Sequence, residues 1–189
     1  MRLHRITSVM GVHNYNIIPG NVCDFLIELF DSNSKNHERV DNKARPNFTQ
    51  LNLNQYYGTM VPELCKYFFA ALSLYKKDVP SAKYLPEVKS LEEFRIKRYV
   101  VGGLDRFDEH VDVGSHSSAK RALAMLFYLN DVESGGRTLF PYQDKSYVPV
   151  KGNVVVFPPT WEYPHTGEPP ISNTKYIMST YLHFSNGHY

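Results

Sequence analysis

Long apolar runs are missing from this sequence of 189 residues. The longest, at residues 122–129, is far shorter than the roughly 20 residues that a transmembrane helix needs. The N-terminal residues also lack the continuous apolar core of a secretory signal. These absences predict a soluble, cytoplasmic protein with no membrane partner.

Blocks of like charge and cysteines are scarce as well. The formal net charge is +2, and no basic block is longer than Lys76–Lys77, which argues against a large nucleic-acid surface and leaves only a local basic groove open. The two cysteines, Cys23 and Cys65, are too few for a disulfide scaffold. We expect both to be free thiols at the edge of a core.

Aromatic residues are plentiful, with 14 Tyr and 11 Phe, and favour a globular, β-rich domain. Apolar residues at helical spacing predict one helix over 22–31, capped by Asn21, and a second over 62–77 with Pro62 in its first turn. Between them, residues 32–58 are polar and Asn-rich. This pattern predicts a long irregular segment, which is either functional or mobile.

From residue 94 onward the pattern changes to short strands separated by Gly and Pro. Helices followed by strands predict an α+β, mainly β fold of the sandwich or jelly-roll type, with the helices buttressing one sheet. We expect one domain over 1–189. Its first part, 1–93, supports a core at 94–184.

The stretch "FDEHVDVGSH" places His110 and Asp112 two residues apart in what reads as a strand, so both would project from the same face. A second histidine, His165, follows in "YPHTG". Two histidines and one carboxylate are the ligand set of non-haem Fe(II). The alternative is a surface His–Asp contact on an edge strand.

Lys175 begins the apolar strand "KYIMSTYLHF", where alternation puts it on one face with Ile177, Ser179 and Tyr181. A lysine at the start of a strand is commonly solvated. If Lys175 points inward, its ammonium needs an anionic partner, because burying an unpaired charge is costly. A carboxylate-bearing cosubstrate would provide that partner.

Taken in order, these motifs resemble the prolyl 4-hydroxylase branch of the 2-oxoglutarate- and Fe(II)-dependent dioxygenases. The resemblance runs from about Phe94 to Phe184 through "KRY", "HVD", "AMLFYLND", "GGRTLFP", "GNVVVFPP", "YPH" and Lys175, and "VCDFLIEL" resembles the branch's opening helix. It implies a double-stranded β-helix (cupin-like) core. It also implies decarboxylation of 2-oxoglutarate to succinate and CO2, coupled to C–H hydroxylation with O2, and ascorbate that rescues uncoupled cycles.

The resemblance also implies a role for individual residues. His110, Asp112 and His165 would hold iron, and Lys175 would bind the distal carboxylate of 2-oxoglutarate. The cosubstrate would also contact Tyr99, Tyr128 and Ser179. The substrate pocket would contain Trp161, Tyr181 and Arg106. For the tyrosines the alternative is ordinary barrel core.

Peptidyl proline is the substrate that the resemblance favours, so a proline-containing peptide or protein is the expected partner. Residues 32–58 and 102–109 would flank the site as lids or as ordered surface loops. A free amino acid or small metabolite is a second candidate substrate. A nucleic-acid demethylase is disfavoured because that branch of the family uses a pair of arginines near this strand, whereas "YIMSTYLHF" holds no arginine. A catalytically silent barrel that binds a partner is the non-enzyme alternative.

Overall fold

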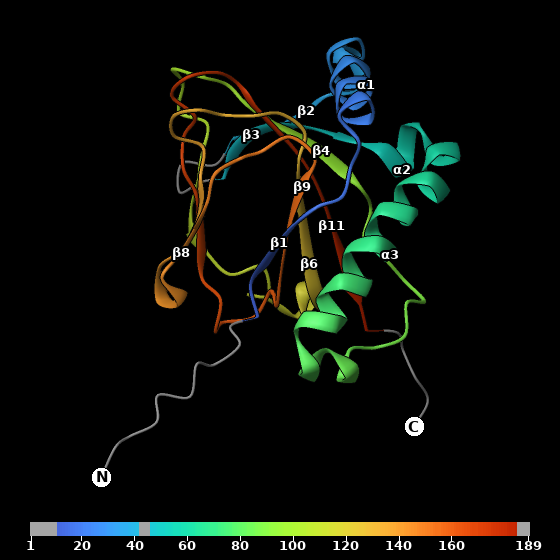
Figure 1. The fold of residues 1–189 in the computed structure, drawn as a ribbon. Helices are drawn as coiled ribbons and strands as arrows, with labels where there is room; N and C mark the ends of the chain where they lie inside the picture. The colour runs from blue at the N-terminus through green and yellow to red at the C-terminus, as the bar shows by residue number, and fades with distance from the viewer. Residues whose placement is uncertain (1–10, 42–45, 185–189) are drawn as a thin grey trace.

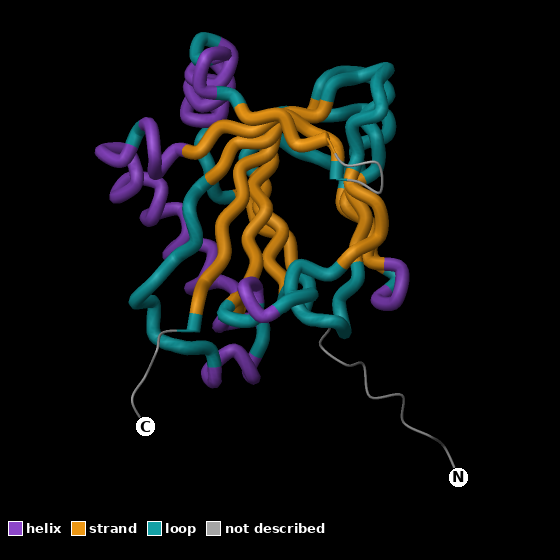
Figure 2. Tube along the Cα trace, turned by 180° about the vertical axis from the view of Figure 1, so that it is seen from behind, coloured by secondary structure: helices purple, strands orange, loops and turns teal. Residues whose placement is uncertain are grey.

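The computed structural model describes residues 11–41 and 46–184, and two antiparallel sheets that face each other form its centre (Figures 1 and 2). The larger sheet has the order β1-β9-β6-β11-β4-β3-β2 and the smaller one β5-β10-β7-β8. The strands are β1 His13–Asn16, β2 Glu38–Asp41, β3 Asn47–Asn52, β4 Arg95–Tyr99, β5 Phe107–His110, β6 Arg121–Tyr128, β7 Thr138–Phe140, β8 Lys145–Tyr147, β9 Asn153–Phe157, β10 His165–Gly167 and β11 Lys175–His183. The mainly β prediction is confirmed.

The α-helices lie on the outer side of the larger sheet, as Figure 2 shows. They are α1 Gly20–Asp31, α2 Leu53–Tyr56 and α3 Val61–Asp78. Short 3-10 turns lie along the chain at η1 Ser34–Asn36, η2 Gly58–Met60, η3 Pro80–Tyr84, η4 His116–Ser118 and η5 Pro141–Gln143, the last two between strands. None of these helices combines the length and the apolar character needed to cross a membrane.

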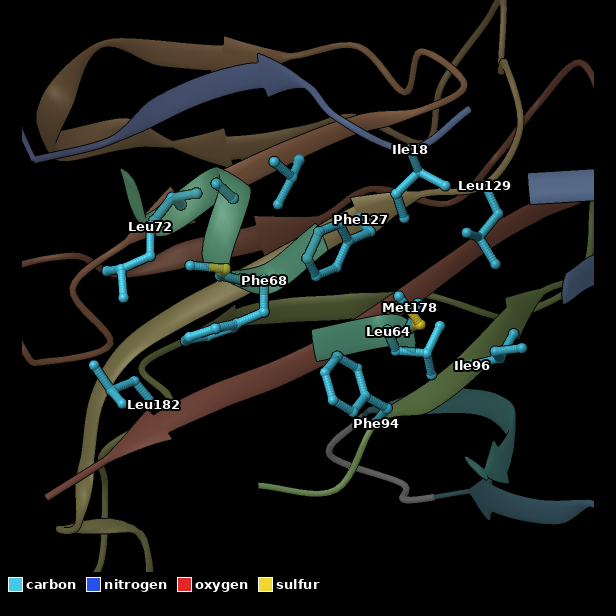
Figure 3. Close-up of a cluster of buried hydrophobic side chains, with 14 of the residues drawn as sticks. Ile18, Leu64, Phe68, Leu72, Phe94, Ile96, Phe127, Leu129, Met178 and Leu182 are labelled. Carbon is cyan, nitrogen blue, oxygen red and sulfur yellow. The ribbon is translucent and has the colours of Figure 1, made fainter. Parts of the chain in front are cut away.

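The central strands bury both of their faces, so the larger sheet separates two cores. One core lies between this sheet and the helices, with Phe68 of α3 and Phe127 of β6 among its members (Figure 3). The other lies between the two sheets and contains Tyr99, Phe157 and Ile177. Burial on both faces explains why residues 122–129 form an unbroken apolar run.

The N-terminal cap predicted for the first helix was wrong. Helix α1 begins at Gly20, one residue after Pro19, and no side chain caps it. Asn21 lies inside the first turn, and the amides of Val22 and Cys23 bond to the carbonyl of Pro19 instead. The second predicted helix is confirmed as α3, with Pro62 in its first turn.

The segment 32–58 is not irregular, contrary to the prediction. Strands β2 and β3 occupy one edge of the larger sheet, and β3 pairs with β4. Polar side chains on the exposed faces mask the strand pattern, although Phe48 and Leu51 are buried. Strand β1 occupies the opposite edge. The N-terminal half therefore contributes three strands to the larger sheet as well as helices. Residues 42–45 of this segment lie outside the described residues.

Truncation of Phe68 should show how much α3 stabilises the sheet. Its ring is fully buried, so Phe68→Ala is expected to lower the free energy of unfolding by about 3–5 kcal/mol. The melting temperature should then fall by roughly 6–20 °C for a chain of this length. The neighbouring Phe69 is half exposed, so Phe69→Ala is the matched control in thermal unfolding. Equal losses in both variants would contradict the assigned packing.

Candidate active site

His110, Asp112 and His165 come together at one end of the space between the sheets. Their ligand atoms all lie within 4.8 Å of one another. Asp112 Oδ1 is 3.6 Å from His110 Nε2, and Asp112 Oδ2 is 3.7 Å from His165 Nε2. The sequence prediction that these three side chains converge is therefore met in the geometry.

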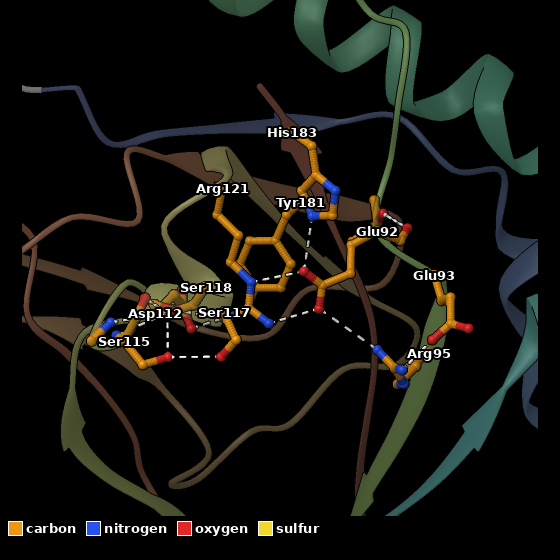
Figure 4. Close-up of polar contacts among 12 residues, drawn as sticks. Glu92, Glu93, Arg95, Asp112, Ser115, Ser117, Ser118, Arg121, Tyr181 and His183 are labelled. Carbon is orange, nitrogen blue, oxygen red and sulfur yellow. Dashed lines mark hydrogen bonds and ion pairs between the residues drawn. The ribbon is translucent and has the colours of Figure 1, made fainter. Parts of the chain in front are cut away.

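The reason given for the pairing of His110 and Asp112 was wrong. Strand β5 ends at His110, and Asp112 lies beyond it, so the two residues do not share a strand face. His110 instead stands opposite His165 in the β5–β10 ladder. Asp112 is held by hydrogen bonds from two residues of the larger sheet. Arg121 Nη1 donates to its carbonyl oxygen at 2.7 Å, and the Tyr181 hydroxyl donates to its Oδ1 at 2.9 Å (Figure 4).

Backbone carbonyls orient both imidazoles. His110 Nδ1 lies 2.7 Å from the carbonyl oxygen of Asp108, and His165 Nδ1 lies 3.2 Å from that of Tyr163. A carbonyl can only accept, so Nδ1 carries the proton and Nε2 keeps its lone pair for the centre of the cluster. Aromatic rings fix the planes: Phe107 stacks on His110 with centroids 3.4 Å apart.

The charge states suit a metal. Burial alone would raise the pKa of Asp112, but the two nearby imidazoles, which attract the carboxylate when they are protonated, and the hydrogen bond from Tyr181 outweigh it and lower the pKa to about 2. Burial lowers the pKa of His165 to about 4, although Asp112 opposes this. At neutral pH the cluster therefore offers a carboxylate and a neutral imidazole lone pair.

One buried atom of the cluster has no partner. Asp112 Oδ2 is buried and accepts no hydrogen bond, which is costly for a charged oxygen. A cation held between Oδ2 and the two Nε2 atoms would satisfy it. The Nε2 atoms of two imidazoles and one carboxylate, open on one side, therefore fit Fe(II).

Lys175 lies deeper in the same cavity and points inward. It is buried, its Nζ donates to the carbonyl oxygen of Gly136 at 2.6 Å, and the rings of Tyr99 and Tyr128 both lie 5.5 Å away. Burial lowers the pKa of Lys175 to about 7, with a small opposing effect from Glu168. No carboxylate of the described residues forms an ion pair with it. The buried ammonium of Lys175 can therefore bind an anionic ligand.

The predicted cosubstrate residues differ in how they meet this cavity. Tyr99 and Ser179 line it with Lys175, as the alternation along the strands predicts, and so does Tyr181, which was expected in the substrate pocket. Tyr128 does not. Its ring is fully buried, and its hydroxyl donates to Thr138 Oγ1 at 2.7 Å, so Thr138 lines the cavity in its place.

Two of the predicted substrate-pocket residues lie elsewhere. Trp161 is 77% exposed and lines neither the cavity nor the pocket at its mouth, and the lone-tryptophan argument carried no information on where its ring would point. Arg106 is also outside both, because its Nε donates to Asp108 Oδ1 at 3.0 Å. Of the three, only Tyr181 lines the cavity.

Sequence reasoning missed several residues that line the site. Lys97 lies two residues before Tyr99 on β4, so alternation could have placed it on the same face. Burial lowers the pKa of Lys97 to about 8, with Asp112 opposing. Glu92 and Arg121 form an ion pair at 2.6 Å beside Asp112, and nothing in the sequence signals that pairing across 29 positions.

Comparison with known proteins places this geometry in a family. Residues 94–183 match the family model of the 2OG-Fe(II) oxygenase superfamily. Prolyl 4-hydroxylase subunit alpha-1 of Gallus gallus is 29% identical over 113 residues, which cover 51% of this chain. That stretch is 22% of the relative's length, so the chain matches only part of it.

Solved structures agree on the fold. The viral collagen prolyl hydroxylase of Paramecium Bursaria Chlorella virus-1 superposes with a TM-score of 0.70 at 20% identity, covering 93% of this chain and 97% of that one. A prolyl hydroxylase from Trichoplax adhaerens, solved with a hypoxia inducible factor peptide fragment, gives 0.67 at 14% identity, covering 92% and 83%. The double-stranded β-helix prediction is thereby confirmed. Residues 94–183 of this chain belong to the 2OG-Fe(II) oxygenase superfamily.

Proposed function

We propose that this chain is an Fe(II)- and 2-oxoglutarate-dependent hydroxylase of peptidyl proline. The observation that carries the proposal is the pairing of two sites in one cavity. The cluster of His110, Asp112 and His165 has an unsatisfied carboxylate oxygen aimed at its centre, and the buried ammonium of Lys175 lies further in. A metal and a dianionic cosubstrate would satisfy both. The prolyl hydroxylases similar to this chain support proline as the residue hydroxylated.

Each residue then has a definite task. His110 Nε2, His165 Nε2 and Asp112 Oδ2 would hold the iron, which when bound supplies the oxidising chemistry that couples loss of CO2 to C–H hydroxylation. Lys175 would bind the distal carboxylate of 2-oxoglutarate. Lysine is a point-charge donor, so the hydroxyls of Tyr99 and Thr138 are suited to complete the hydrogen bonds.

The walls of the cavity keep water from the reacting atoms and orient the substrate. The apolar side chains of Phe107, Phe157 and Ile177 line the cavity beside the cluster. Orientation of a C–H bond in a dry cavity is the main contribution that a protein makes to such chemistry.

Succinate release under air, with Fe(II), 2-oxoglutarate and a panel of proline-containing peptides, tests the proposal. We expect one or more peptides to stimulate release and to gain 16 mass units at proline by mass spectrometry. The same assay without peptide, and with Zn(II) in place of Fe(II), is the control. Added ascorbate should sustain turnover where decarboxylation is uncoupled.

Other outcomes of this assay would redirect the proposal. Release stimulated by a free amino acid but by no peptide would favour the small-metabolite alternative. No release from protein that demonstrably holds iron would favour a catalytically silent barrel that acts as a binding module.

A further inference from the structure

Lys97 occupies a distinctive place at the mouth of the cavity. In the β4–β11 ladder, Tyr99 stands opposite Lys175, Lys97 opposite Ile177, and Arg95 opposite Ser179. Lys97 therefore lies two residues along the ladder from the level of Lys175, on the side nearer to solvent. It lines both the inner cavity and an outer pocket of about 280 Å³. Lys97 therefore lies where the outer pocket meets the inner cavity, close to the path of a substrate.

The other cations of the outer pocket are already neutralised. Arg121 donates from Nε and Nη2 to the two carboxylate oxygens of Glu92 at 2.8 and 2.6 Å. Arg95 forms ion pairs with Glu93 and, at 3.7 Å, with Glu92 (Figure 4). Each of these charges is therefore balanced within the pocket.

Lys97 has no such partner. Among the described residues its ammonium makes no ion pair and no hydrogen bond, and Nζ lies over the ring of Phe48 on β3, 5.1 Å from the ring centroid. An aromatic ring attracts a cation only weakly and leaves its charge uncompensated. A half-buried ammonium without an ion-pair partner favours an anionic ligand.

The charges of the loaded site point the same way. The proposed iron carries two positive charges and Lys175 one, and these balance the two negative charges of 2-oxoglutarate and the one of Asp112. Lys97 then remains as a positive charge in excess at the mouth. A substrate that carries a carboxylate near the reacting carbon would neutralise it.

The shape of the pocket favours a peptide over a free amino acid as the source of that carboxylate. The outer pocket shares residues with a neighbouring groove of about 440 Å³, to which Ser90, Ser117 and Lys120 also contribute; the shared residues are Glu92, Glu93, Arg95 and Arg121. Space beyond a single residue is what an extended chain requires.

We propose that Lys97 binds the side-chain carboxylate of an acidic residue beside the hydroxylated proline, so that the substrate class is an acidic proline-containing peptide. This inference rests on the proposed function and adds a specificity-determining residue to it.

Peptides that differ only in charge test the inference. In one set Glu moves from two residues before the proline to two after it, and in the matched set Gln replaces Glu. With Zn(II) and 2-oxoglutarate bound, so that no turnover occurs, the protein should bind the best Glu peptide about tenfold more tightly than its Gln partner. With Fe(II), KM for hydroxylation should follow the same order.

Variants then assign the preference to Lys97. Lys97→Gln should abolish the Glu-over-Gln preference, and Lys97→Glu should favour the same peptide with Lys in place of Glu. Lys76→Gln, at an exposed position on α3, makes the same charge change away from the site and should keep the preference.

Each contrary result has its own meaning. Equal binding and equal hydroxylation of the Glu and Gln peptides by the wild type would overturn the role of Lys97 and leave the proposed function standing. A preference that Lys76→Gln also removes would assign it to overall charge and would likewise overturn that role. Failure to bind or hydroxylate any peptide, while free proline is hydroxylated, would overturn both.

Discussion

Replacement of His165 by alanine is expected to abolish 2-oxoglutarate-dependent succinate formation. The ring supplies one of the three atoms that converge on the unsatisfied Asp112 Oδ2, and the two remaining donors would hold a metal weakly. Loss of an outer hydrogen-bond partner alone typically costs about 10–100-fold in metal affinity, so loss of a ligand should cost more than about a hundredfold.

The substitution also has a structural effect that must be separated from the chemical one. The His165 ring packs between Phe140 and Phe157, with centroids 5.4 and 4.8 Å away. Its removal should lower the free energy of unfolding by about 1–3 kcal/mol, which leaves a folded chain with a reduced melting temperature. Asp112→Asn, which keeps the shape of the side chain, is the companion variant and should lose metal as well.

Metal binding should therefore be measured apart from activity. Co(II) titration followed by visible absorption reports on the ligand set, and His116→Ala, which truncates an exposed histidine, is the matched control. Unaltered Co(II) affinity and spectrum in folded His165→Ala would remove His165 from the metal cluster.

Much of this site was readable from the sequence because strand alternation persists wherever a strand is well paired. The inward face of β11, with Lys175, Ser179 and Tyr181, lies where a period of two puts it. The same rule would have revealed Lys97 from Tyr99. Alternation failed at Asp112, since the strand ends at His110 and a period has no meaning beyond it.

Other features depend on contacts that no local pattern encodes. Strands β2 and β3 carry mostly polar side chains at a sheet edge, so they read as loop until the pairing of β3 with β4 is known. Tyr128 faces the space between the sheets as expected, yet its hydroxyl is directed to Thr138 on another strand. The positions of Trp161 and Arg106 likewise depend on loop geometry, which composition does not determine.

Replacement of Lys175 by alanine is expected to raise the dissociation constant for 2-oxoglutarate by on the order of a hundredfold, because the distal carboxylate would be buried without its charge partner. Mn(II)-loaded protein allows this to be measured by calorimetry without turnover. Lys145→Ala, at an exposed position on β8, is the control and should bind as the wild type does. An unchanged dissociation constant in Lys175→Ala would exclude the proposed contact.

The pH dependence gives an independent test of the same contact. Burial lowers the pKa of Lys175 to about 7 in the free protein, and a bound carboxylate would raise it, because the anion favours the charged ammonium. Binding then takes up a proton above pH 7, so affinity should be highest below that pH and weaken by up to about tenfold per unit as pH rises. Lys175→Arg keeps its charge throughout this range and should flatten the profile relative to the wild type, even if its larger head binds less tightly. The same slope in both proteins would assign the titration to another group.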